Sequence, residues 1–152
     1  MKVYRLSRSA YAADLSGKGA SLKGGRWNSA GVDMIYTADS RALAMAEVMV
    51  HFSAAMVPRD YRMVELNIPD DLPVQHTMVK DLPEDWHVFP YRTSTQAIGD
   101  EFVRANQYSL LRVPSAVVPG DFNFLLNPHH PDFKKISILK TEKFPFDARM
   151  FR

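Results

Sequence analysis

An arginine flanked by glycines and a tryptophan is the first group of residues that could bind a ligand. The stretch reads Gly24-Gly25-Arg26-Trp27-Asn28. Glycine lets the backbone approach a ligand closely, and an arginine beside it can donate two parallel hydrogen bonds to a phosphate. The tryptophan adds a face for stacking. A tight turn with one exposed arginine would show the same composition, so both interpretations stay open.

A carboxylate inside an apolar segment is the second group. Glu47 lies within residues 41–52, whose other members are nearly all apolar. Burying a carboxylate is costly unless it is paired or lines a cavity, and such surroundings tune the pKa of catalytic carboxylates. The alternative is a narrow solvent-facing stripe that Glu47 shares with His51, four residues later on a helix.

Two hydroxyl groups complete the candidates. Ser115 lies in the apolar run 113–119, which lacks the Gly-x-Ser-x-Gly pattern of a hydrolase nucleophile. We expect Ser115 to donate a hydrogen bond in a pocket wall, or to be satisfied by the backbone. Tyr36 directly precedes the apolar helical segment and could stack on a ring, although a tyrosine in the core is the commoner case.

Histidine and cysteine usage excludes several kinds of chemistry. The sequence has no cysteine, which removes disulfides, thiolate zinc sites and cysteine nucleophiles. His129 and His130 are adjacent and point in different directions on an extended chain, and the other histidines lack ligand spacing. We therefore expect no metal site. The same adjacency argues against a ribonuclease, which needs two histidines facing one phosphate.

Length, composition and charge narrow the class of protein. The chain has 152 residues, 46% hydrophobic and 24% charged, which predicts one soluble globular domain over residues 1–152. A net charge of +2 without a basic stripe predicts no direct binding of nucleic acid. The first residues contain no apolar signal region, and no apolar stretch is long enough to span a membrane. We expect a cytoplasmic protein without membrane contact.

The elements that position these residues are short and do not alternate strictly. Alternating apolar residues predict about six strands among the segments 3–6, 34–37, 62–68, 74–79, 109–113, 116–118, 123–126 and 136–140. Helices are predicted over 41–52, capped by Asp39 or Ser40, and over 96–106, capped by Ser94 or Thr95. Residues 7–31 form a long loop, or a short helix plus a loop. The pattern predicts a compact α+β domain with a mixed sheet of short strands and a few helices.

Several of these motifs, taken in order, resemble the RES domain family, which is named for an arginine, a glutamate and a serine. The resemblance rests on residues 24–28, 35–38 with 44–47, 113–119, 123–128 with 130–133, and 146–149. It covers nearly the whole chain. Residues 69–92 match no motif of the family.

The resemblance implies a toxin of a bacterial toxin–antitoxin pair, with a fold related to ADP-ribosyltransferases. Such toxins use NAD⁺ as a substrate and cleave its nicotinamide–ribose bond with water or inorganic phosphate; no cofactor is implied. The implied partner is an Xre-like helix-turn-helix antitoxin that blocks the active site and forms a hetero-oligomer with the toxin. Two other functions stay open: ADP-ribosylation of a protein, and a non-catalytic module that binds a nucleotide or a partner.

The resemblance also implies a role for each candidate residue. Arg26 would hold the NAD⁺ pyrophosphate or an incoming phosphate, and Tyr36 would pack against nicotinamide or its ribose. Glu47 would stabilise the positive charge that develops on the ribose or orient the nucleophile, and Ser115 would bind the ligand or position Glu47. Other residues expected to line the same pocket are Gly25, Trp27, Asn28, Asn123 and Asn127.

Overall fold

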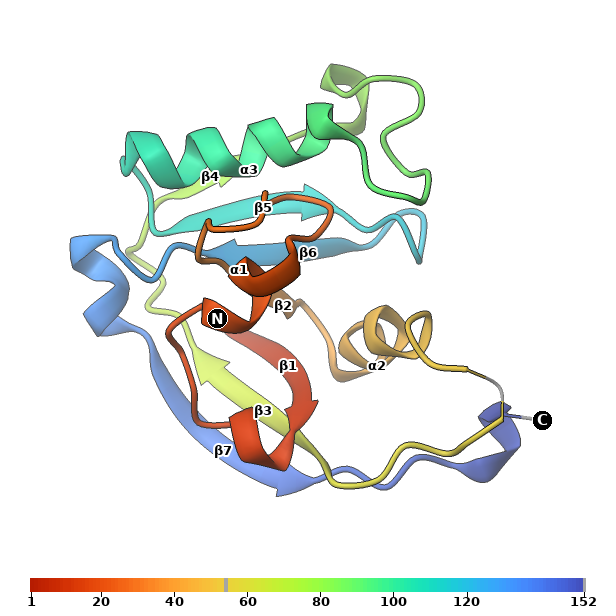
Figure 1. The fold of residues 1–152 in the computed structure, drawn as a ribbon. Helices are drawn as coiled ribbons and strands as arrows, with labels where there is room; N and C mark the ends of the chain where they lie inside the picture. Colours follow the sequence, from red (N-terminus) through yellow and green to blue (C-terminus); the bar gives the residue numbers. More distant parts are fainter. Residues whose placement is uncertain (54, 152) are drawn as a thin grey trace.

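The computed structural model describes residues 1–53 and 55–151 (Figure 1). Within them, seven strands form one mixed sheet that is accompanied by three α-helices. The strands are β1 (Lys2–Arg8), β2 (Ile35–Ala38), β3 (Tyr61–Asn67), β4 (Val74–His76), β5 (Leu110–Pro114), β6 (Phe122–Leu126) and β7 (Ser137–Lys143). The helices are α1 (Lys18–Lys23), α2 (Arg41–Met49) and α3 (Thr93–Ala105). The predicted α+β class with a mixed sheet of short strands is confirmed.

The sheet has the strand order β4-β5-β6-β2-β1-β3-β7, and only β4 and β5 run parallel. It is narrowest at its centre, where β2 and β1 are joined through one residue pair, Tyr4 opposite Ala38. By contrast, β1 pairs with β3 along its whole length. The sheet therefore behaves as two halves, β4-β5-β6-β2 and β1-β3-β7.

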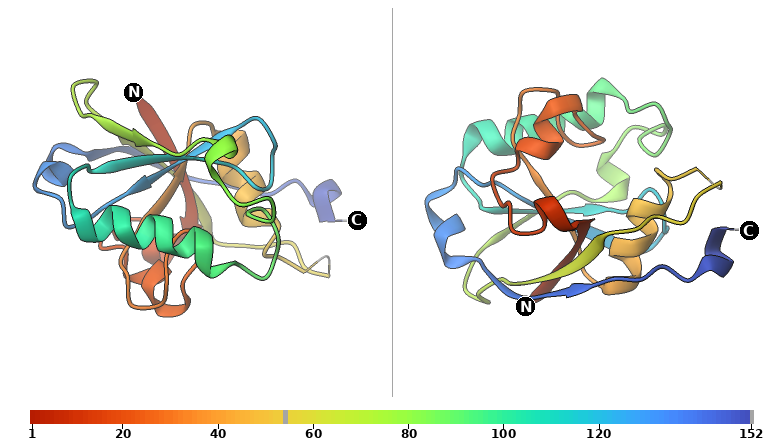
Figure 2. Two further views of the ribbon diagram at one scale, coloured as in Figure 1. Left: turned by 90° about the horizontal axis from the view of Figure 1, so that it is seen from above. Right: turned by 60° about the horizontal axis from the view of Figure 1, so that its bottom comes forward.

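Alternate residues of each strand face opposite sides of the sheet, and both sides are apolar. On one side, residues of the two halves form a common core, which includes Val3, Val64, Leu66, Leu110, Phe124 and Leu126. On the other side, α3 covers β5 and β6 through Phe102, which packs with Leu111 and Leu125 (Figures 1 and 2). Helix α2 packs beside it, through Leu43 and Ala44, against strands of the second half.

Helix α2 begins at one of the two predicted caps. The Ser40 side chain accepts a hydrogen bond from the Leu43 amide at 3.0 Å, which satisfies one of the free donors of the first turn. The helix ends at Met49, three residues before the predicted end. An apolar composition nearly all round predicts a helix that is buried on most faces, but only Leu43 and Ala44 are buried, so that prediction is wrong. The helix lies with one side on the sheet, and its apolar residues elsewhere are half-buried or exposed.

The chain after β7 returns to α2. Phe146 is buried with Leu43 and Ala44 of the helix, and its ring meets that of Phe52 edge-on at 5.8 Å. Phe151 also contacts Phe52, at 6.4 Å between ring centroids. The C-terminal segment thus lies beside the loop that follows α2 (Figure 2, right) and supports the helix from behind.

Three predicted boundaries differ from the structure. Residues 116–118 form a turn, because the Ser115 hydroxyl accepts hydrogen bonds from the amides of Val117 at 3.1 Å and Val118 at 3.0 Å, which withdraws them from strand pairing. Helix α3 begins at Thr93, without a side-chain cap, so the predicted caps at positions 94 and 95 lie inside it. Strand β4 ends at His76 instead of residue 79.

No helix of the described part of the chain is long and apolar enough to cross a membrane.

Candidate active site

A carboxylate from α2 is hydrogen-bonded to the β5–β6 hairpin. Oε1 of Glu47 accepts from Ser115 Oγ at 2.6 Å and from Asn123 Nδ2 at 2.6 Å. Ser115 directly follows β5, and Asn123 lies in β6. Within residues 1–53 and 55–151, no side chain or amide donates to Oε2 of Glu47. The two donors therefore fix the carboxylate in orientation and leave one of its oxygens to a ligand.

The proton of the Ser115 hydroxyl has a defined direction. Its oxygen accepts from two backbone amides, those of Val117 and Val118, and a hydroxyl has two acceptor positions and one proton. The proton is thus directed to Glu47. Ser115 is 2% exposed, which keeps water from competing for it. Ser115 thus contacts Glu47 directly, which is the geometry that the positioning role implied by the resemblance requires.

Asn123 has one polar atom to spare. Its amide nitrogen donates to Glu47, while its amide oxygen is buried and has no hydrogen-bond partner among the described residues. A buried acceptor without a donor is costly. Because this oxygen is inaccessible, Asn123 acts on Glu47 through its amide nitrogen.

The two interpretations of Glu47 are now distinguished. Its side chain is half-buried against the hairpin, whereas His51 is exposed and lies beyond the end of α2. Glu47 and His51 do not form a shared solvent-facing stripe on the helix. The carboxylate has neutral hydrogen-bond donors, so its negative charge remains available.

The side chain of Arg26 contacts the segment formed by residues 86–91 at several points. Its Nη1 donates to the carbonyl oxygens of Trp86 at 2.8 Å and Val88 at 3.0 Å, and its Cζ lies 5.1 Å from the centroid of the Tyr91 ring. Burial lowers the pKa of Arg26, and the nearby Tyr91 and Glu47 oppose that shift. The guanidinium remains charged, and its Nε and Nη2 make no hydrogen bond within the described residues.

Tyr36 holds the loop that presents Arg26. Its hydroxyl donates to Asn28 Oδ1 at 2.6 Å and accepts from the Trp27 amide at 3.0 Å. Burial raises the pKa of Tyr36, so the hydroxyl stays a donor. A Cβ on Gly25 would lie 2.7 Å from this hydroxyl, which explains why a glycine precedes Arg26. The Tyr36 hydroxyl therefore contacts the loop, while packing of its ring against nicotinamide or its ribose stays a prediction.

The side chains of Trp27 and Asn28 point into the protein. Trp27 is 2% exposed and packs on Trp86, with 6.2 Å between ring centroids. Asn28 is fully buried and donates to the carbonyl oxygens of Ala20 and Val32, both at 3.0 Å. These side chains shape the loop, and neither makes a contact with the Glu47 group.

The structure does not bring Asn127 to the same group, which corrects the expectation that it lines the pocket. Asn127 follows the opposite end of β6 from Asn123, and four strand residues span about 13 Å. Its amide nitrogen donates to Asn106 Oδ1 at 2.8 Å, and its amide oxygen accepts from the His129 amide at 3.0 Å. Both polar ends therefore connect loops.

Tyr91 is a residue of this region that the sequence did not indicate. It lies in the stretch 69–92, which carries no motif, and only its contact with Arg26 identifies it. No pattern of residue types or spacing could have found it, because the contact joins two loops that are distant in sequence.

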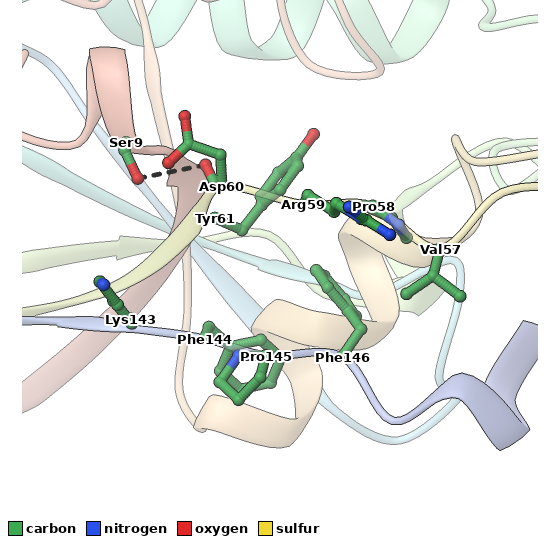
Figure 3. A pocket seen from close by; sticks show the side chains of 10 residues that line it. All are labelled: Ser9, Val57, Pro58, Arg59, Asp60, Tyr61, Lys143, Phe144, Pro145 and Phe146. Carbon is green, nitrogen blue, oxygen red and sulfur yellow. Dashed lines mark hydrogen bonds between the residues drawn. The ribbon is translucent and has the colours of Figure 1, made fainter.

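Two cavities differ in their relation to this chemistry. One of about 310 Å³ is lined by Ser115 and Ala116 on one side and by Trp86 and His87 on the other, so it adjoins the Glu47 group. A larger one of about 500 Å³ lies between residues 57–61 and 143–146 (Figure 3). Its lining contains none of the candidate residues. We assign the site by its charged and polar groups and not by cavity size.

The arrangement suits a substrate that is anionic at one point and becomes positive at another. The free fork of Arg26 can bind a phosphate, and the fixed carboxylate of Glu47 can stabilise a developing cation. Within residues 1–53 and 55–151, no cluster of three His, Asp or Glu side chains is placed to hold a metal ion.

Comparison with known proteins places these residues in a family context. The model of the RES domain matches residues 2–147. A Sphingobium sp. protein named Prs ADP-ribosylating toxin is 38% identical over 148 residues, 96% of this chain and 92% of its own length. Toxin Res of Photorhabdus laumondii is 37% identical, over 100% of this chain and 98% of its own length. The crystal structure of the M. tuberculosis MbcT–MbcA toxin–antitoxin complex contains a chain with a TM-score of 0.75 at 21% identity, covering 99% of this chain and 86% of that one.

Proposed function

Because the chain belongs to the RES domain family of toxins, we propose that it cleaves the nicotinamide–ribose bond of NAD⁺. One observation carries this proposal. Glu47 is a carboxylate that neutral donors hold by one oxygen, and its second oxygen has no hydrogen-bond donor among the residues that the structure describes. Such a group stabilises a cation without first having to be released from a salt bridge.

The leaving group, nicotinamide, does not require a general acid from the protein. The C1′–N bond breaks with its electron pair going to the ring nitrogen, so the cationic nicotinamide ring leaves as neutral nicotinamide. Positive charge appears on the ribose, spread between C1′ and the ring oxygen, as in glycoside hydrolysis. The Oε2 atom of Glu47 faces that charge. Water then adds to C1′ and releases a proton, which gives ADP-ribose; inorganic phosphate would give the 1-phosphate of ADP-ribose.

Arg26 would bind the pyrophosphate that is attached to the nicotinamide ribose. Its Nη1 is committed to two carbonyl oxygens, so the NAD⁺ pyrophosphate would be bound through Nε and Nη2, the edge that can donate two parallel hydrogen bonds. The Tyr36 hydroxyl keeps the loop of Arg26 in place. Arg26 and Glu47 thereby hold the ribose between a bound phosphate and a fixed carboxylate.

ADP-ribosylation of a protein is the second candidate. The relative from Sphingobium sp., named Prs ADP-ribosylating toxin, supports it at 38% identity. The bond that breaks and the role of Glu47 would be the same, and a nucleophilic side chain of the target would replace water at C1′. The two candidates differ only in the acceptor.

We also propose an antitoxin partner of the Xre-like helix-turn-helix kind, which forms a hetero-oligomer with this chain and covers the site. The likeness of the fold to a chain of the MbcT–MbcA toxin–antitoxin complex supports a partner of the antitoxin class. This chain itself would then contact no DNA.

The test follows NAD⁺ by proton and phosphorus NMR with the purified chain, with and without inorganic phosphate, beside the Glu47→Gln variant. Free nicotinamide from the wild-type chain alone supports the proposal. A new phosphorus signal that requires phosphate identifies phosphorolysis, and ADP-ribose identifies hydrolysis. Nicotinamide release only after addition of a cell extract, with label transferred to a protein, favours the second candidate. NAD⁺ that stays intact in every arm contradicts both and leaves the non-catalytic binding module.

A further inference from the structure

Tyr91 lies at the face of Arg26, on a segment that Arg26 itself holds. The ring centroid is 5.1 Å from the guanidinium carbon, a distance at which an aromatic face attracts a cation. The carbonyl oxygens of Trp86 and Val88, on the same segment, accept from Nη1. The salt bridge between Arg92 and Asp85, at 3.1 Å, joins the residues that flank the two ends of this segment. Tyr91 is therefore fixed relative to Arg26.

The hydroxyl of Tyr91 has no partner in the protein. Among residues 1–53 and 55–151, no atom forms a side-chain hydrogen bond with it, whereas the Tyr36 hydroxyl forms two. The Tyr91 side chain is half-buried, so part of it is open to a ligand. The hydroxyl is not among the buried polar atoms that lack a partner, so it is accessible and can donate to a ligand.

The charges around Tyr91 define what it faces. Its pKa is raised by burial, lowered by Arg26 and raised by Glu47. Trp86 and His87 of the same segment line one cavity with Ser115, the hydrogen-bonding partner of Glu47. At neutral pH the phenol stays protonated and can donate. Arg26 would bind the pyrophosphate and Glu47 would face C1′. A donor that contacts Arg26, on a segment that shares a cavity with Ser115, is therefore placed at the part of the dinucleotide that joins them.

We propose that Tyr91 is a substrate-binding residue whose hydroxyl donates a hydrogen bond to NAD⁺ between the groups bound by Arg26 and Glu47. This inference rests on the proposed function. It concerns the Tyr91 hydroxyl, which differs from that of Tyr36 because the Tyr36 hydroxyl is already hydrogen-bonded within the protein. The acceptor is a ribose hydroxyl or a pyrophosphate oxygen, both of which accept hydrogen bonds.

The first test is kinetic and compares two matched variants. Tyr91→Phe keeps the ring against Arg26 and removes only the hydroxyl, and Tyr11→Phe removes a hydroxyl from an exposed tyrosine outside the site. A lost hydrogen bond to ligand predicts a KM for NAD⁺ raised about 3- to 10-fold in Tyr91→Phe. We expect kcat to stay within about twofold and Tyr11→Phe to match the wild-type chain.

The second test is direct. NAD⁺ is added to the Glu47→Gln variant carrying ¹³C-labelled tyrosine rings, and intermolecular nuclear Overhauser effects are recorded. We expect an effect between a tyrosine ring and a ribose proton of NAD⁺, and we expect it to vanish from the spectrum of the double variant Glu47→Gln, Tyr91→Phe.

The outcomes separate this inference from the proposed function. If the wild-type chain releases nicotinamide and Tyr91→Phe has an unchanged KM, the inference is wrong and the proposed function stands. An Overhauser effect that survives in the double variant likewise overturns it. If the wild-type chain neither binds nor cleaves NAD⁺, both fail together.

Discussion

Two carboxylates, Glu47 and Asp33, lie at opposite ends of the β2–β6 pair, and they are held in opposite ways. Glu47 is bound at the Asn123 end by neutral donors alone. Asp33 lies at the other end, where its Oδ2 accepts from Lys18 Nζ at 2.7 Å and contacts His129 Nε2 at 2.8 Å. The hydrogen bond from Lys18 lowers the pKa of Asp33. One carboxylate is neutralised within the protein, and the other is not.

The difference teaches how a carboxylate is kept for a ligand. A carboxylate that is paired with a lysine is not available to a ligand, because breaking the ion pair would leave a charge without compensation. Serine and asparagine orient a carboxylate without cancelling its charge. Glu47 is therefore suited to meet a cation that forms during a reaction, while Asp33 joins two loops.

The largest expected effect tests this division directly. Glu47→Gln keeps the shape and removes the charge, so we expect kcat for nicotinamide release to fall by about 10²- to 10³-fold. The melting temperature should stay near that of the wild-type chain, since the partners of Glu47 are neutral. Asp33→Asn serves as the matched control, and its folded fraction should turn over NAD⁺ at the wild-type rate. Equal losses of activity in the two variants would remove the distinction.

Ser115→Ala comes next. It removes the donor that fixes Oε1 of Glu47 and the acceptor for two backbone amides. A hydrogen bond to a charged group is worth about 1.5–3 kcal/mol, which corresponds to a loss of about 10- to 100-fold in kcat. Ser115→Cys, with a weaker donor, should lose less. Wild-type kcat in Ser115→Ala would show that Asn123 alone positions the carboxylate.

Asp33→Asn should lower stability rather than turnover. We expect a loss of about 1–3 kcal/mol in the free energy of unfolding at pH 7, as for hydrogen bonds to charged groups. Because the pKa of Asp33 is lower in the folded chain, its stabilising contribution is present above the unfolded value near 4 and is lost as the pH falls below it. Urea unfolding of both chains at pH 7 and pH 3 tests the sign. A difference that grows on acidification contradicts this account.

The smallest effect is expected for His129→Gln. The imidazole is 59% exposed, and exposed pairs contribute at most about 1 kcal/mol. Its loss leaves Lys18 on Asp33, so the free energy of unfolding should fall by less than in Asp33→Asn. A larger fall would identify the imidazole, and not the lysine, as the main partner of Asp33.

Most of the secondary structure could be predicted from local sequence patterns. The predicted segments coincide with all seven strands to within a few residues, one strand more than the six expected, and the cap at Ser40 located the start of α2. The prediction of a strand over 116–118 was wrong because Ser115 binds the amides of that stretch. A hydrogen bond from one side chain to two amides overrides β propensity, and composition does not reveal it.

The site was predictable only in part, for a related reason. Spacing singled out Arg26, Glu47 and Ser115, since each is a polar residue in unusual surroundings. It could not separate Asn123, which meets Glu47, from Asn127, which joins loops, because the two differ only in which end of β6 they occupy. Tyr91 and the Asp33–His129 pair arise from contacts between distant loops. Such pairings come from the tertiary fold.

The support of α2 by Phe146 has a consequence for synthesis. A ribosome delivers Glu47 first, its hydrogen-bonding partners Ser115 and Asn123 later, and Phe146 near the end of the sequence. A growing chain thus holds the reactive carboxylate long before the groups that orient it and the ring that seats its helix. Assembly of the site waits for the last strand and the segment beyond it. A nascent chain that has not yet reached residue 146 would therefore contain Glu47 without the assembled site.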